Sequence, residues 1–266
     1  MRKSLHTILV AAALVCGLAF TSCSVYDDRG SCPGWLTVCV VRLDAPELAG
    51  KPLSVLVTDG AGVAADTVIT PSDYPGGYDV EVMPGNVSLS AFVGGKTLMR
   101  DGSVLSLPAG GEVDSLYTFS YDTCVDYPTT VCVEPLKDFC TLTVVVEGSE
   151  PWGGQGSWDV TLPWNGADMM AWRPVPGNHD AYMRYVGDGR WEYRIPRQGG
   201  YGQTLVFDGP SGGPLVIDLG KVMEEAGYDW GKGSLDDFTL YVREAEGRWT
   251  WDVAPWNDGG DRVIVV

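Results

Sequence analysis

The sequence predicts a mostly β protein with two tandem β-sandwich domains and one short helix in the second domain. Three observations predict this class. Short runs of alternating apolar and polar residues recur along the chain, as in half-buried strands. The 35 Gly and 17 Pro residues supply turns between these runs. Helical spacing of apolar residues is convincing in one segment only.

The expected strands share short length, alternation or β-branched and aromatic content, and flanking turn residues. They cover residues 35–43, 53–58, 78–82, 87–93, 116–121, 129–134, 139–147, 192–195, 204–207, 238–242 and 262–266. Trp249 and Trp251 have the same-face spacing of a further strand. Pro84 and Gly85 predict the turn of a hairpin between the strands around Val80 and Val87.

The single expected helix covers residues 219–226. Asp218 is suited to cap its first free backbone N–H groups, and Gly227 is suited to the left-handed residue that ends a helix. Four apolar residues at i, i+3, i+4 and i+7 give one apolar face: Leu219, Val222, Met223 and Ala226. We interpret this helix as a crossover element packed on a sheet.

The first residues have the pattern of a membrane-targeting signal. Arg2 and Lys3 precede an apolar run at residues 8–20, which is shorter than the ~20 residues that a spanning helix needs. Small residues and Cys23 follow, and residues 20–23 (FTSC) resemble a bacterial lipobox. We therefore expect residues 1–22 to be a lipoprotein signal peptide and Cys23 to carry acyl chains that anchor the mature protein. The alternative is an ordinary signal peptide with a coincidental Cys.

The mature chain is expected to divide at residue 136. Residues 23–135 would form the N-terminal sandwich, and residues 136–266 the C-terminal one. A Pro-Leu-Lys-Asp segment at 135–138 interrupts the strand pattern, and nine of the ten Trp lie between residues 152 and 256. The two segments have the ordinary length of single domains.

Five cysteines remain beyond the signal and the acylated Cys23. Export would place them in an oxidising compartment where disulfides persist. The disulfide candidates are Cys32, Cys39, Cys124, Cys132 and Cys140. Their pairing and the free member of this odd set are left open, and Cys39 could also be a small core residue.

Composition argues against several function classes. The formal net charge is −17, and loss of Arg2 and Lys3 with the signal makes the mature chain more acidic, so we exclude nucleic acid as a partner. His179 is the only histidine of the mature chain, and its Pro-Gly-Asn-His-Asp context predicts an exposed loop. The acidic clusters at 236–237 and 257–261 lack calcium-loop spacing. We expect no catalytic residue, no metal and no cofactor, although a carboxylate pair for glycoside hydrolysis stays open.

The tryptophan-rich second half has two interpretations. Trp side chains fill the core and cover the ends of sandwiches in many β proteins. Exposed Trp could instead stack on sugar rings. The second interpretation would make the chain a surface lipoprotein that binds glycans through its second domain.

Three stretches together resemble the fimbrillin-associated anchor proteins of Bacteroidales type V pili. They are residues 23–33 (CSVYDDRGSCP), residues 83–95 (MPGNVSLSAFVGG), and residues 217–230 (IDLGKVMEEAGYDW) with 237–242 and 249–253 after them. The resemblance implies two transthyretin-like β-sandwich domains and no enzymatic activity. It implies a lipoprotein, exposed on the cell outer membrane and attached through Cys23, that holds the fimbrium base and limits fimbrium length. Fimbrial subunit proteins would be its partners, bound by strand addition.

The resemblance also carries expectations for particular residues. Asp27 and Asp28 are similar to the surface-export signal of this phylum. Residues 66–68 and 114–116 resemble its O-glycosylation motif, which makes Thr67 and Ser115 candidate acceptors. Anchors of the family keep their first strand, whereas stalk subunits lose it to a protease. We therefore expect residues 35–43 to be retained, with no cleavage after Arg29 or Arg42.

Overall fold

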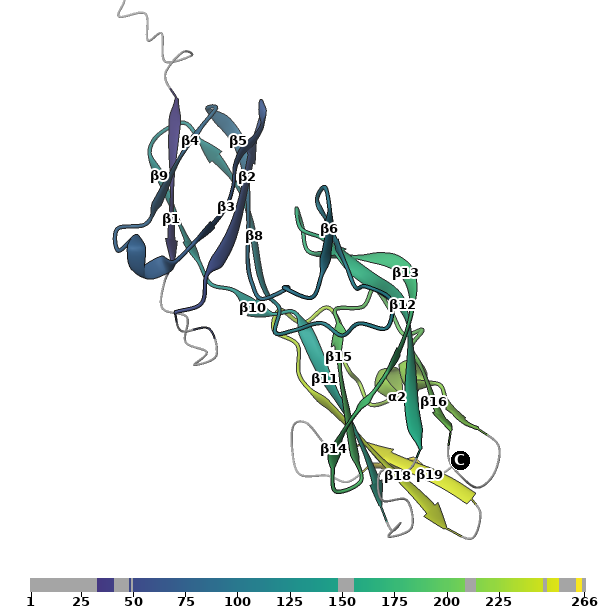
Figure 1. Ribbon diagram of the computed structural model, residues 1–266. Coiled ribbons are helices and arrows are strands. Elements are labelled where there is room, and N and C mark those ends of the chain that lie inside the picture. The colour runs from purple at the N-terminus through teal and green to yellow at the C-terminus, as the bar shows by residue number, and fades with distance from the viewer. Residues whose placement is uncertain are drawn as a thin grey trace, which may run out of the picture. The chain divides into compact units, whose positions relative to one another are not determined.

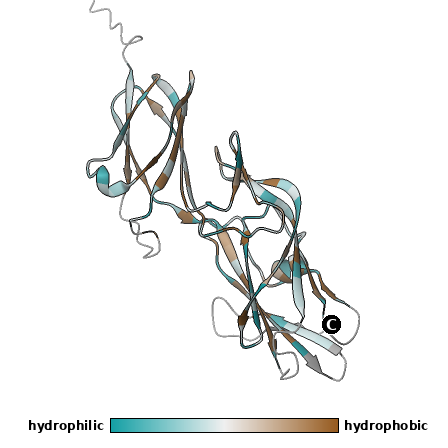
Figure 2. Cartoon of the chain, in the orientation of Figure 1, coloured by the Kyte–Doolittle hydropathy of each residue, from teal (hydrophilic) through white to brown (hydrophobic). Residues whose placement is uncertain are grey.

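The computed structural model describes residues 33–40, 48, 50–147, 156–208, 214–245, 248–253 and 262–264. The described chain is mostly β, as predicted, and its strands form four sheets with a single α-helix (Figure 1). Figure 2 shows hydrophobic residues along the strands. Hydrophobic strand residues make up most of the buried core. The acylation candidate Cys23 lies outside the described residues, as do Cys32, Asp27, Asp28, Arg29 and Arg42.

Two sheets are built almost entirely from the first half of the chain. The first has the order β4-β1-β9, with β1 at Gly34–Val40, β4 at Tyr78–Val82 and β9 at Thr129–Val133. The second has the order β10-β8-β5-β2-β3. Its strands are β2 Leu53–Asp59, β3 Gly62–Ile69, β5 Gly85–Val93, β8 Tyr117–Val125 and β10 Leu136–Lys137. A short 3-10 turn, η3, covers Pro71–Asp73.

The other two sheets are built mainly from the second half. One has the order β14-β15-β11-β18-β19-β20. Its strands are β11 Phe139–Glu147, β14 Arg184–Gly187, β15 Arg190–Pro196, β18 Phe238–Ala245, β19 Arg248–Val253 and β20 Arg262–Ile264. The other has the order β17-β16-β12-β7-β6, with β13 paired to β12. Its strands are β6 Met99–Asp101, β7 Val104–Ser106, β12 Ser157–Asp168, β13 Arg173–Tyr182, β16 Thr204–Asp208 and β17 Leu215–Ile217.

Two short elements pair with the sheets of the other half of the chain. β10 follows residue 135 yet pairs with β8. The β6–β7 hairpin precedes residue 135, and β7 pairs with β12 over Gly166–Asp168. Backbone hydrogen bonds therefore join the halves, and the division at residue 136 stays a prediction.

The hairpin predicted at Pro84 and Gly85 is wrong. β4 pairs with β1, whereas β5 pairs with β2 and β8, so the two strands belong to different sheets. Gly85 has a φ of 121°, which an L side chain rarely adopts. The Pro-Gly signal marks a sharp change of direction from one sheet to the other, and turn residues alone do not distinguish this from a hairpin.

The predicted helix is confirmed. α2 covers Leu219–Glu225, and the Asp218 carboxylate accepts a hydrogen bond from the Lys221 N–H at 3.0 Å. Leu219, Val222 and Met223 are buried. Gly227 follows with a φ of 77°, so both end signals act as the sequence predicts.

Gly166 is required where β12 pairs with β7. An added Cβ would lie 2.3 Å from the Leu105 carbonyl oxygen, although the Gly166 backbone does not itself require glycine. We expect Gly166→Ala to lower the free energy of unfolding by roughly 1–3 kcal/mol or more, because backbone must move to accommodate the methyl group. Gly76 has open space where a Cβ would lie, so Gly76→Ala should change the free energy of unfolding by less than about 0.5 kcal/mol. Urea unfolding of the two variants measures the difference, and equal values would contradict the packing argument.

Candidate functional site

The first strand is seated inside its own sheet. β1 pairs antiparallel with β4 from Gly34 to Val38 and parallel with β9 from Leu36 to Val40. Leu36 and Val38 point into the core with 0% and 1% exposure, whereas Trp35 is 44% exposed on the other face. Buried side chains on one face and backbone hydrogen bonds on both edges therefore hold residues 35–39 in the sheet.

β4 and β9 depend on β1 for their place in the sheet. Among the described strands, each has β1 as its only hydrogen-bonded neighbour. The Thr37 hydroxyl adds a 2.6 Å hydrogen bond to the Asp79 carboxylate on β4. Removing β1 would leave two isolated strands and expose the core under Leu36, so this strand completes its sheet.

Four of the candidate disulfide residues are described, and all four hold free thiols. Cys39 on β1 stands directly opposite Cys132 on β9 in the parallel register. Cys124 is exposed, and its pKa is raised, first by a hydrogen bond with Asp126. Cys140 is fully buried on β11, and burial raises the pKa of its thiol to about 12. Cys140 is thus a core cysteine, whereas Cys39 lies half-buried on the outer side of its sheet.

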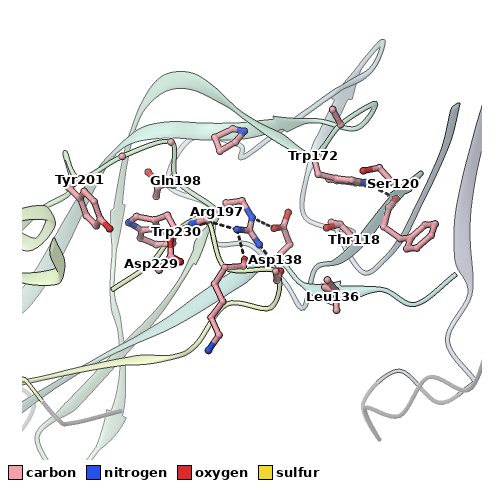
Figure 3. A pocket seen from close by; sticks show the side chains of 18 of the residues that line it. Thr118, Ser120, Leu136, Asp138, Trp172, Arg197, Gln198, Tyr201, Asp229 and Trp230 are labelled. Atoms are coloured by element: carbon pink, nitrogen blue, oxygen red, sulfur yellow. Dashed lines mark hydrogen bonds and ion pairs between the residues drawn. The ribbon is translucent and has the colours of Figure 1, made fainter. Parts of the chain in front are cut away.

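A cleft of about 850 Å³ lies beside the start of β11 (Figure 3). It is lined by parts of β8 and β10, by residues 171–174, by residues 197–201 and by the 229–233 segment. Trp172 stands at one side with a φ of 49°, an uncommon conformation for a bulky residue. Its ring N–H donates to the Phe119 carbonyl at 3.0 Å, and its ring meets Phe92 edge-on. These contacts hold Trp172 in place.

Arg197 and Asp138 form a buried ion pair at the cleft. The Asp138 side chain is 3% exposed, and the Arg197 Nε–H donates to its carboxylate. The remaining guanidinium N–H groups donate to backbone carbonyls of Trp230, Lys232 and Gly233. In Figure 3, Arg197 reaches from Asp138 to the 229–233 segment. Arg197 therefore fixes that segment against the start of β11.

Burial dominates the electrostatics of Asp138. It raises the pKa of the carboxyl group to about 6, because a carboxylate loses hydration when it is removed from water. The charge of Arg197 and hydrogen bonds from Arg197 and Thr118 act in the opposite direction and only partly offset burial. Arg197 donates hydrogen bonds to the Asp138 carboxylate and to three backbone carbonyls, so the ion pair has a structural role.

His179 does not lie in an exposed loop, and that prediction is wrong. It belongs to β13 and is 4% exposed. Its Nε2 lies 2.8 Å from the Gly111 carbonyl oxygen and 3.1 Å from the Tyr193 hydroxyl. The alternation of β13 points residues 179 and 181 into the core, so His179 is a hydrogen-bonded core residue.

The other residues singled out in the sequence are spread over the surface. Thr67 lies half-buried on β3, and Ser115 lies half-buried before β8. Asp237 accepts hydrogen bonds from the Lys137 ammonium at 2.6 Å and the Thr141 N–H at 2.7 Å. The acidic cluster at 257–261 lies outside the described residues. The fold does not gather these residues into one site.

Within the described residues, no three His, Cys, Asp or Glu side chains come together as a metal site would require. No described helix has the length and hydrophobicity to cross a bilayer.

Four of the seven second-half tryptophans whose side chains are described are buried, and Trp164 is half-buried. Trp158, Trp172, Trp191 and Trp230 belong to the core, and Trp249 and Trp251 pack against it. Trp152 and Trp256 lie outside the described residues. Among the tryptophans whose side chains are described, Trp35 of β1 is the exposed one. The described part of the second half therefore presents no exposed tryptophan for stacking on a sugar.

Solved structures share this arrangement over most of the chain. The fimbrial anchor protein Mfa2 from Porphyromonas gingivalis matches with a TM-score of 0.63 at 13% sequence identity, covering 85% of this chain and 98% of that one. The chain shares its fold with this fimbrial anchor protein. An adhesin-type structure from Bacteroides ovatus matches at 0.61 and 14% identity, over 88% and 95% of the two chains.

A third match comes from Bacteroides thetaiotaomicron and is described as a polysaccharide-binding protein. It aligns with a TM-score of 0.60 at 13% identity, over 87% of this chain and 98% of that chain. No protein-family model and no curated protein sequence matches the chain. The mostly β fold expected from the resemblance is confirmed by these shared structures.

Proposed function

We propose that this chain is an outer-membrane lipoprotein that acts as the anchor, or an accessory subunit, of a type V fimbrium. Residues 1–22 would be removed, Cys23 would be acylated, and the folded part would hold the fimbrium base at the cell surface. Its partners would be fimbrial subunit proteins and the lipid of the outer membrane. No catalytic step belongs to this role.

The observation that carries the proposal is the pairing of β1. An anchor must transmit load from its lipid to its folded part, and the segment after Cys23 leads directly into β1. Hydrogen bonds to β4 and β9 and the burial of Leu36 and Val38 tie that strand into the fold. The likeness to the anchor protein Mfa2 supports the same role.

Strand addition needs an accessible sheet edge, and β3 offers one. This eight-residue strand pairs with β2 on one side and is the last strand in its sheet among the described residues. Its Val63 and Val68 side chains are 66% and 63% exposed. An extended subunit segment could pair with this edge through main-chain hydrogen bonds, with side-chain pockets giving register.

The test uses cells that assemble fimbriae with a Cys23→Ser variant. We expect loss of fatty-acid label from the protein and fimbriae that are shed or abnormally long, since the lipid link is broken. Cys16→Ser is the matched control, because Cys16 lies in the expected signal peptide and should change neither result. Retained label, or fimbriae of normal length and attachment in the Cys23→Ser cells, would refute the anchor role.

The glycan-binding alternative rests on one of the structural matches, which is described as a polysaccharide-binding protein. The burial of Trp158, Trp172, Trp191 and Trp230 weighs against the tryptophan-based form of this function. We therefore favour the fimbrial role.

A further inference from the structure

We propose that the Cys39 and Cys132 thiols form a disulfide that ties the first strand to β9 in the exported protein. The inference rests on the export step of the proposed function, because disulfides persist in an oxidising compartment. It does not depend on fimbriae or on lipid. It resolves a pairing that the sequence leaves open.

The register of the first sheet carries the argument. Cys39 and Cys132 are direct partners in the parallel ladder of β1 and β9. Neighbouring strands lie about 4.8 Å apart, within the Cα separation of roughly 4.4–6.8 Å that disulfides show. Partners in register project to the same face of a sheet, so the Cys39 and Cys132 side chains are neighbours on that face. Bond formation therefore needs little movement of the backbone.

The other described cysteines have no cysteine opposite them. Cys124 is in register with Asn86, and its thiol contacts Asp126 at 3.5 Å. Cys140 is in register with Ile195 and is fully buried. Within the described part of the chain, Cys39 and Cys132 are the pair that the fold brings together.

The oxidation balances with an oxidised dithiol protein of the envelope as the oxidant. The thiolate of the exposed Cys132 attacks the disulfide of the oxidant and forms a mixed disulfide. The Cys39 sulfur then attacks the Cys132 sulfur and releases the second oxidant sulfur as a thiol. One S–S bond forms and one breaks, and the two electrons and two protons pass to the oxidant.

The consequence is a covalent path around the hydrogen bonds of β1. Load on the segment before β1 would reach β9 through the bond, even if β1 lost its pairing with β4 or β9. A break in the chain between residues 40 and 131 would also leave the N-terminal segment attached. The bond would thus lock in place the strand that completes the sheet.

The experiment isolates the full-length protein from cells with thiols blocked at lysis and digests it with chymotrypsin. Cleavage after Trp35 separates Cys32 from Cys39, and a further digestion with endoproteinase Asp-N, which cleaves before Asp126, separates Cys124 from Cys132. We expect one linked peptide pair containing Cys39 and Cys132, which disappears on reduction. It should be absent from Cys39→Ser and Cys132→Ser proteins and present in the matched control Cys124→Ser.

A second arm tests the pairing without export. The purified full chain is reduced and then incubated with oxidised glutathione, where the same linked peptide should form and raise Tm by roughly 5–15 °C. If the thiols stay free in this buffer, or if Cys39 or Cys132 pairs with another cysteine, the proposal is overturned. A bond that forms in glutathione but is absent from cells would refute export into an oxidising compartment and, with it, the disulfide of the exported protein.

Discussion

Arg197→Met is expected to lower the free energy of unfolding by about 3–5 kcal/mol, because it leaves the Asp138 carboxylate buried without its partner. Asp138 is 3% exposed in its side chain, so water cannot replace the guanidinium without opening the site. The substitution also frees the 229–233 segment, whose carbonyls accept hydrogen bonds from Arg197. Urea unfolding at pH 8 measures the loss.

Arg100→Met is the matched control. Arg100 pairs with Asp66 through two hydrogen bonds of 2.9 Å and 2.7 Å, but these side chains are 40% and 45% exposed. An exposed ion pair contributes about 1 kcal/mol or less. Because both substitutions replace Arg by Met, the difference between their losses in free energy of unfolding measures the effect of burying the ion pair. Equal losses would show that Asp138 is not buried in solution.

The pH dependence gives this prediction a second readout. The folded-state pKa of Asp138, about 6, lies above its unfolded value of 3.8. The folded state thus binds more protons than the unfolded state between these values, and the contribution of Asp138 falls by roughly 3 kcal/mol as pH rises through this window. Without Arg197 the folded-state pKa should rise further. The deficit of Arg197→Met should then be smaller at pH 5 than at pH 8, and adding Asp138→Asn should reduce the deficit at pH 8.

Strands with clean alternation could be predicted from the sequence, and strands with turn residues could not. Tyr78–Val82 and Phe139–Glu147 match their predicted bounds. β12 and β13 were missed because they contain Pro163, Gly166, Pro176 and Gly177, which indicate loops. The structure places register shifts between Leu162 and Trp164 and between Trp164 and Gly166. These irregularities accommodate the turn residues inside a ladder, and they also explain why His179 was misplaced.

Contacts between residues far apart in the chain could not be predicted from the sequence. Asp138 and Arg197 are 59 positions apart, and neither residue type signals burial by itself. Cys39 and Cys132 each stand in an ordinary strand run, and only the parallel register of β1 with β9 places them opposite each other. The tryptophan-rich half suggested a binding surface, yet tertiary packing buries four of its seven described tryptophan rings. Composition predicts which residue types are available, and register decides which of them meet.

Leu36→Lys is expected to abolish the first sheet, with a loss of free energy of unfolding above about 4 kcal/mol, because an unpaired ammonium would enter the core beneath β1. Trp35→Lys is the matched control at the neighbouring position. Trp35 is 44% exposed and stands opposite Glu81, so its replacement keeps the charge in water beside a carboxylate. Its effect should stay within about 0.5 kcal/mol.

The decisive measurement for Leu36→Lys is amide hydrogen exchange resolved along the chain. β4 and β9 pair only with β1 among the described strands, so their amides should lose protection when Leu36 is replaced. β11 and β15 pair with each other over Phe139–Val145 in a different sheet, and their amides provide the internal reference. Protection that persists on β4 and β9 in the Leu36→Lys protein would mean that these strands do not need β1. The first strand would then be dispensable to the fold, and load on the lipid could not reach the folded part through β1.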